Sequence, residues 1–123
     1  MGRKLKDFFT MLAVCHTCMV EKDPLSPSVL KYSASSPDEL ALVQGAKSVG
    51  IEYIKRTSTN ITIICNPTRV EEDYEVICEF PFDSTRKRMS LIIKHLQTGK
   101  HYLMTKGADS IMLPRVKIDI QTQ

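Results

Sequence analysis

The hydrophobic pattern of the chain changes period at Gly50, and this change limits the folds that the chain can adopt. From Ile51 onward, apolar and polar residues alternate in short runs, which is typical of half-buried β-strands. The connections between most of these runs are short, so neighbouring strands are expected to pair as antiparallel hairpins. Before Gly50 the apolar residues follow helical spacing. The sequence therefore predicts an α+β fold, with an antiparallel β-sheet and helices packed against it.

The expected order of elements is two helices followed by at least five strands. The helices are expected at residues 4–20 and 37–49, and the strands at 51–56, 61–65, 74–82, 88–95 and 100–106. A loop is expected between the helices at 21–35, because Pro24 and Pro27 disfavour regular structure. A short helix after Gly107 is expected to stop at Pro114.

Composition narrows the class of protein. The chain has 123 residues, 42% of them hydrophobic and 25% charged, which suits one globular domain. Its formal net charge of +3 is too small to indicate a nucleic-acid partner. No segment is long enough to span a membrane. We expect a monomer with no nucleic-acid ligand.

The N-terminal segment admits two interpretations. Arg3, Lys4 and Lys6 precede an apolar run, as in a signal peptide. Asp7 and Thr10 interrupt that run, however, and the apolar residues follow helical spacing, which favours a helix of the mature chain.

The stretch Cys15-His16-Thr17-Cys18 has the C-x-x-C spacing of redox and zinc sites. No second pair of ligands completes a zinc set, and no strand precedes the motif. We therefore favour a position on an amphipathic helix, with all four cysteines reduced, and we expect no metal site. The three histidines lack ligand spacing and are assigned to the surface or the core.

The stretch Ser36-Pro37-Asp38-Glu39 has the pattern of a helix start. Ser36 suits the N-cap, Pro37 the first helical position, and Glu39 completes a capping box. Glu39 either closes the helix or reaches a ligand. We expect the Ser36 hydroxyl to supply the cap, which leaves Glu39 free.

Two further stretches could carry chemistry. Pro81 suggests an edge or bulge after which Phe82 is re-aimed to stack on a planar base, although on pattern alone Phe82 is a core residue. The run Arg86-Lys87-Arg88 is either a solvated turn or an anion site. Lys106, before Gly107, is either an ordinary strand-ending lysine or a ligand contact at a close turn.

Taken together, the stretches "KYSASSPDELALVQGAK", "FPFDSTRKRMSLII" and "TKGAD" resemble, in order and spacing, the nucleotide-binding (N) domain of the type IV P-type ATPases, the phospholipid flippases. "LAVCHTCMVEKD" resembles an upstream segment of the same family, and the match extends from about Phe8 to Met112.

The resemblance implies an ATP-binding domain in a cytosolic loop of an integral membrane protein. Phe82 would stack on adenine, Glu39 would lie at the adenine edge, Lys106 would line the pocket, and Ser84 would be a secondary contact. The ligand would be ATP, bound as Mg-ATP, with its γ-phosphate presented to an aspartate on another domain. The implied partners are the remaining cytosolic and transmembrane domains of the parent ATPase and an accessory subunit.

The sequence also departs from the family. The phosphorylated D-K-T-G segment is absent, so we expect no catalytic residue and no activity from the chain alone. We expect a boundary segment at 1–6, a nucleotide-binding domain at 7–113 with an incomplete C-terminal end, and a tail at 114–123. The alternative is a stand-alone interaction module that binds acidic ligands through the turn Arg86-Lys87-Arg88.

Overall fold

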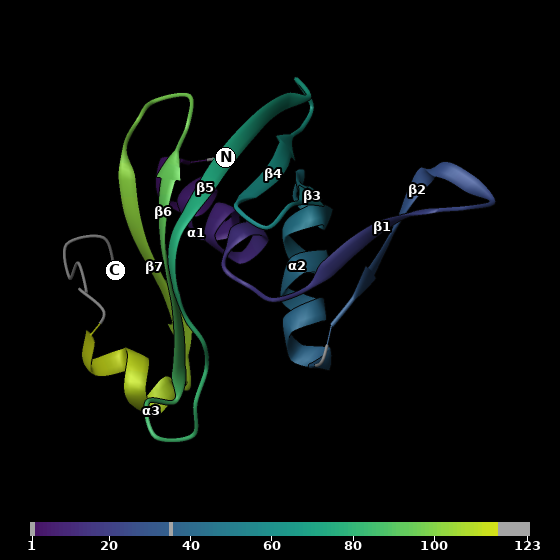
Figure 1. The fold of residues 1–123 in the computed structure, drawn as a ribbon. Coiled ribbons are helices and arrows are strands. Elements are labelled where there is room, and N and C mark those ends of the chain that lie inside the picture. Colours follow the sequence, from purple (N-terminus) through teal and green to yellow (C-terminus); the bar gives the residue numbers. More distant parts are fainter. Residues whose placement is uncertain (1, 35, 116–123) are drawn as a thin grey trace.

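The computed structural model describes residues 2–34 and 36–115 (Figure 1). Its helices are α1 (Arg3–Val14), α2 (Pro37–Ser48) and α3 (Asp109–Met112), with a 3-10 turn η1 at Leu113–Arg115. Its strands are β1 (Met19–Asp23), β2 (Ser26–Ser33), β3 (Ile51–Arg56), β4 (Asn60–Cys65), β5 (Val70–Phe80), β6 (Arg88–His95) and β7 (His101–Gly107). No helix of this described part is long and apolar enough to cross a bilayer.

The main sheet has five strands in the order β3-β4-β5-β6-β7, and every neighbouring pair is antiparallel. Each strand therefore pairs with the next one along the chain, as short hairpin connections require. The predicted α+β class with an antiparallel sheet is confirmed. Strand β5 is longer than expected at its start and ends before Pro81, because proline cannot donate to the ladder.

The core lies between the sheet and the two longer helices, which pack against each other and against β3 and β4 (Figure 1). Its fully buried members include Val14 and Ala13 from α1, and Val43 and Ala46 from α2. The sheet contributes alternate residues of its strands, namely Tyr53, Ile61, Ile63, Leu91 and Ile93. Burial of each such large side chain contributes about 1.5–3 kcal/mol.

Helix α1 ends at Val14, so the expected helix to residue 20 is wrong. The apolar spacing continues past Val14 because Cys15, His16 and Cys18 are buried in a turn instead, whereas Thr17 is exposed. The ring of His16 holds this turn: Nε2–H donates to the carbonyl of Ala13 at 2.7 Å, and Nδ1 accepts from the N–H of Cys18 at 3.0 Å. A side chain thus satisfies backbone groups that a longer helix would have used.

The expected loop at 21–35 is also wrong, because β1 and β2 pair there as an antiparallel hairpin. Pro24 lies in the turn, and Pro27 lies where the register shifts between Lys22 and Asp23, so neither proline interrupts a regular ladder. Figure 1 shows the hairpin projecting away from the main sheet. The hydroxyl of Tyr32 ties it back by donating to the carbonyl of Tyr53 at 2.7 Å.

The predicted short helix after Gly107 is confirmed as α3. Helix α3 already ends at Met112, before Pro114. Pro114 lies within η1, since a proline is compatible with the first residues of a helical turn. Residues 116–123 of the predicted tail lie outside the described residues.

Candidate functional site

A cavity of about 710 Å³ lies at one end of the main sheet, among the start of α2, the end of β7 and the segment after β5. This volume is within the usual range of small-molecule pockets. Three of the four residues expected to contact nucleotide, Glu39, Phe82 and Lys106, line it. The other lining residues are Thr17, Ser36, Asp38, Leu42, Pro81, Met89, Gly107 and Ala108.

Glu39 lies in the first turn of α2, and its two carboxylate oxygens have different partners. Oε1 accepts hydrogen bonds from the backbone N–H of Thr17 at 2.9 Å and from the Thr17 hydroxyl at 2.5 Å. Oε2 accepts from the ammonium group of Lys106 at 2.9 Å. The side chains of Glu39 and Lys106 are only 13% and 18% exposed, so this ion pair is largely shielded from solvent.

These contacts set the charge of Glu39. Burial alone would raise its pKa, but the hydrogen bonds from Thr17 and Lys106 outweigh burial and lower the pKa from 4.5 to about 2. Donors that favour the charged form of a carboxyl lower its pKa in this way. Glu39 is therefore an ionised acceptor at neutral pH.

The start of α2 differs from the expected capping box. Ser36 occupies the N-cap with extended backbone, and Pro37 takes the first helical position as predicted. The Ser36 side chain makes no capping hydrogen bond, so the expectation that its hydroxyl caps the helix is wrong. Glu39 does not close the helix either, because its carboxylate turns toward Thr17 and Lys106, which are better donors in a shielded site.

Phe82 is 62% exposed, which contradicts the alternative of a core residue. Strand β5 ends at Phe80, and Pro81 then takes the chain out of the ladder. Phe82 therefore has a ring surface available at the cavity wall. Figure 1 shows that this β5–β6 connection lies at the same end of the sheet as α3.

The basic turn that follows, Arg86-Lys87-Arg88, makes most of its contacts with residues close by in the chain. The guanidinium group of Arg86 donates to the carbonyl of Pro81 at 3.3 Å and lies 5.7 Å from the ring centre of Phe80. Arg88 donates to the carbonyl of Arg86 at 3.1 Å. Ser84 precedes this turn in the chain and is not among the described residues that line the cavity. Its contact with nucleotide stays a prediction.

Gly107 brings the end of β7 against the basic turn. A Cβ atom at this position would lie 2.6 Å from the carbonyl oxygen of Lys87 and 2.8 Å from Cβ of Arg88. Such distances are too short for any residue larger than glycine, as the close turn predicted here requires. The backbone N–H of Ala108 also donates to Lys87 at 3.2 Å. Gly107 thereby fixes Lys106 at the mouth of the cavity.

Thr17 is a polar cavity residue that the sequence patterns do not predict, because the C-x-x-C spacing singles out the two cysteines on either side of it. Cys15 and Cys18 are buried, unpaired thiols, and burial raises the pKa of each to about 11. Within the described residues, no group of three or more His, Cys, Asp or Glu side chains could hold a metal ion. The one available signal was that Thr17 lies inside the stretch that carries the family resemblance.

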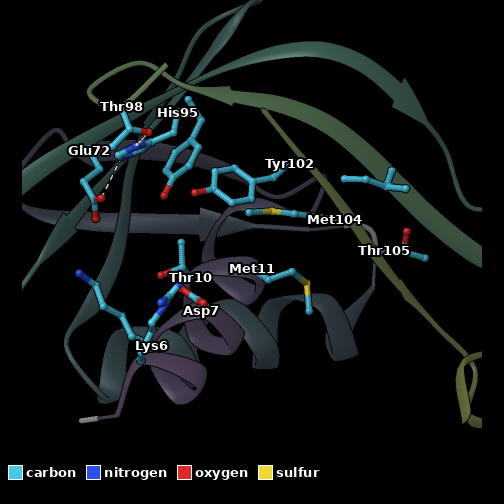
Figure 2. A pocket seen from close by; sticks show the side chains of 13 residues that line it. Lys6, Asp7, Thr10, Met11, Glu72, His95, Thr98, Tyr102, Met104 and Thr105 are labelled. Atoms are coloured by element: carbon cyan, nitrogen blue, oxygen red, sulfur yellow. Dashed lines mark hydrogen bonds and ion pairs between the residues drawn. The ribbon is translucent and has the colours of Figure 1, made fainter. Parts of the chain in front are cut away.

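A second cavity, of about 520 Å³, lies between α1 and the strands β5 to β7 (Figure 2). His95 is buried in its wall, with Nε2 at 2.9 Å from Glu72 and Nδ1 at 2.7 Å from the Thr98 hydroxyl. Figure 2 shows Met11 of α1 and Met104 of β7 on opposite walls. The sequence alone places His95 in the core or on the surface and does not predict this network.

The chain is similar to proteins of known family. Residues 4–118 match the family described as P-type ATPase, cytoplasmic domain N. The phospholipid-transporting ATPase DRS2 of Saccharomyces cerevisiae is 41% identical over 112 residues, and phospholipid-transporting ATPase IK of Homo sapiens is 40% identical over 113 residues. Each alignment covers 91% of this chain and 8% of the relative, so the chain spans a small part of their length. The chain therefore belongs to the cytoplasmic N domain family of the P-type ATPases, in the type IV, phospholipid-transporting group.

Proposed function

We propose that this chain is the ATP-binding domain of an ATPase that couples ATP hydrolysis to phospholipid translocation. The observation that carries the proposal is that Glu39, Phe82 and Lys106, from three separate segments, line one cavity of ligand size. An exposed ring, a shielded carboxylate and an ammonium group are a suitable set for a purine base.

Each residue has a role in this proposal. The exposed ring of Phe82 stacks on adenine, an interaction worth about 1–3 kcal/mol per base. Oε2 of Glu39 accepts a hydrogen bond from the adenine amino group, since a carboxylate oxygen has two lone pairs and Lys106 uses one. Lys106 lies beside the base. The ligand arrives as Mg-ATP, with the magnesium ion held by the phosphates.

The rest of the reaction belongs to other parts of the parent protein. In the proposal, the γ-phosphate is presented to an aspartate on another domain, and the isolated chain, which lacks a D-K-T-G segment, is inactive. The parent is an integral membrane protein with this domain in the cytosol. Its partners are the other cytosolic domains, the transmembrane domain and an accessory subunit.

A nucleotide titration of the ¹⁵N-labelled chain tests the proposal. We expect Mg-ATP to shift amide resonances around Glu39, Phe82 and Lys106, and ADP to bind with an affinity within about tenfold of ATP, because the cavity offers no phosphate cradle. Shifts confined to residues 84–88, with an equal response to inorganic polyphosphate, would instead indicate the interaction module that binds acidic ligands.

A further inference from the structure

We propose that the turn of residues 15–18 is the positioning element of the cavity, and that Thr17 gives the cavity its selectivity for a base with an amino group over one with a carbonyl. Thr17 does so by holding Oε1 of Glu39, which leaves Oε2 as the acceptor that faces the ligand. This inference rests on the proposed function, because it names the residue that makes the same cavity specific for adenine.

Thr17 reaches Glu39 with two donors from one residue. Its backbone N–H and its hydroxyl both point to Oε1, at 2.9 and 2.5 Å. Two donors on one carboxylate oxygen fix both the position of the carboxylate and its rotation about the bond to the side chain. Oε2 must then point to Lys106 and the cavity. Without the hydroxyl, Oε1 would keep only the backbone N–H of residue 17 and the Cys18 thiol, whose sulfur lies 3.9 Å away, so the carboxylate would be held less firmly.

The turn that carries Thr17 is itself held by four hydrogen bonds. The ring of His16 bonds to backbone groups on both sides of it, and burial lowers the pKa of this histidine to about 4, which keeps the ring neutral. Outside the turn, the hydroxyl of Tyr53 donates to the carbonyl of Cys18 at 2.9 Å, and Arg56 donates to the carbonyl of His16 at 3.1 Å. Residues of β3 thus lock the turn to the main sheet.

Selectivity follows from this orientation. Oε2 has one lone pair left, so it accepts a hydrogen bond from an exocyclic amino group such as that of adenine. Inosine and guanine carry a carbonyl at the same ring position, which would place two acceptors against each other. A site that accepts a hydrogen bond from a ligand group disfavours an analogue that lacks this group, because that hydrogen bond is lost. A carboxylate free to rotate would relieve that conflict.

Thr17 is suited to a direct test because its side chain is exposed outside the core. Thr17→Val keeps the branched shape and removes the hydroxyl, whereas Thr17→Ser keeps the hydroxyl. We expect Thr17→Val to lower the ratio of ATP affinity to ITP affinity by about tenfold, and Thr17→Ser to keep it within about twofold. Calorimetric titrations of the three chains with Mg-ATP and Mg-ITP measure this ratio, and thermal melts check that all three are folded.

A second measurement needs no nucleotide. Carbon NMR of the Glu39 carboxyl group across acid pH should show a higher pKa in Thr17→Val than in the wild type, and a wild-type value in Thr17→Ser. An unchanged pKa together with an unchanged ATP to ITP ratio in Thr17→Val would overturn the inference while leaving ATP binding intact. A wild-type chain that binds neither nucleotide would overturn the proposed function, and the selectivity role with it.

Discussion

The cavity beside Glu39 and the cavity beside His95 both contain an acid held by a basic group at 2.9 Å, yet they differ in the hydrogen-bonding groups that they leave available. In the first, Glu39 meets Lys106, whose ammonium group has three N–H donors, and the neighbouring ring of Phe82 is exposed. In the second, both ring nitrogens of His95 are already used, and the ring of Tyr74 packs 5.0 Å from the histidine.

The difference separates a candidate binding site from a structural network. The carboxylate of Glu72 accepts from His95 on one oxygen and from the Cys65 thiol at 2.9 Å on the other, so its partners all belong to the fold. Polar groups that already have partners inside the protein have less capacity left for a ligand. The first cavity, which combines the Lys106 ammonium group with the exposed ring of Phe82, is therefore the stronger candidate for a binding site.

The largest expected effect is on stability at the second cavity. Tyr74 is 5% exposed and packs on His95, so Tyr74→Ala should lower the free energy of unfolding by about 3–5 kcal/mol. Tyr102, 44% exposed in the same wall, is the matched control, and Tyr102→Ala should cost far less. Urea denaturation measures both. Equal losses of unfolding free energy in the two variants would mean that the packing of Tyr74 on His95 contributes no special stability.

The next effect is on binding at the first cavity. Phe82→Ala should weaken ATP binding by about 1–3 kcal/mol, because base stacking is lost, whereas Phe82→Tyr keeps the ring and should bind nearly as the wild type does. Because Phe82 is exposed, neither change should alter the unfolding midpoint much. Calorimetry provides the affinities. Wild-type affinity in Phe82→Ala would remove Phe82 from the site.

The ion pair of the first cavity should appear in the pH dependence of stability. The pKa of Glu39 is about 2 in the folded chain and 4.5 ordinarily, so its contribution is complete above about pH 4.5 and is lost as the pH falls toward 2. After allowance for solvent screening we expect about 1–2 kcal/mol. Urea midpoints between pH 2 and 6 should show a shallower loss in Glu39→Gln. Parallel profiles would show that the pair contributes nothing.

The smallest effect concerns the start of α2. Because the Ser36 hydroxyl makes no capping bond, Ser36→Ala should change stability by less than about 0.5 kcal/mol, rather than by the 1 kcal/mol typical of a lost cap. A thermal melt is sufficient. A loss near 1 kcal/mol would mean that the Ser36 hydroxyl does cap α2 in solution.

The main sheet could be predicted from the sequence because its signals are local. Alternation from Ile51 onward and short turns such as Gln97-Thr98-Gly99 specify strands and hairpins without knowledge of distant contacts. The region from Cys15 to Ser33 could not be predicted in the same way. There His16 replaces helix hydrogen bonds with its own ring, and the hairpin depends on a contact between Tyr32 and Tyr53.

Three residues of the candidate site could be predicted to lie together, but their hydrogen bonds could not. Glu39, Phe82 and Lys106 were chosen by their local patterns and by resemblance, and they meet in one cavity. The partner of Glu39 could not be read from the sequence, because Ser36 is near in the chain whereas Thr17 and Lys106 are brought close only by folding. Capping rules describe an isolated helix, and here a tertiary contact outcompetes them.

The contact between Glu39 and Lys106 also determines when the cavity can exist. It joins residues that are 67 positions apart, and Lys106 reaches it only from β7, the last strand of the sheet. Closing so long a loop is slow compared with forming hairpins or helices. During synthesis, α2 and the first strands can fold before β7 has left the ribosome, whereas the candidate site cannot. Any ligand of this cavity would therefore bind only chains in which β7 has joined the sheet.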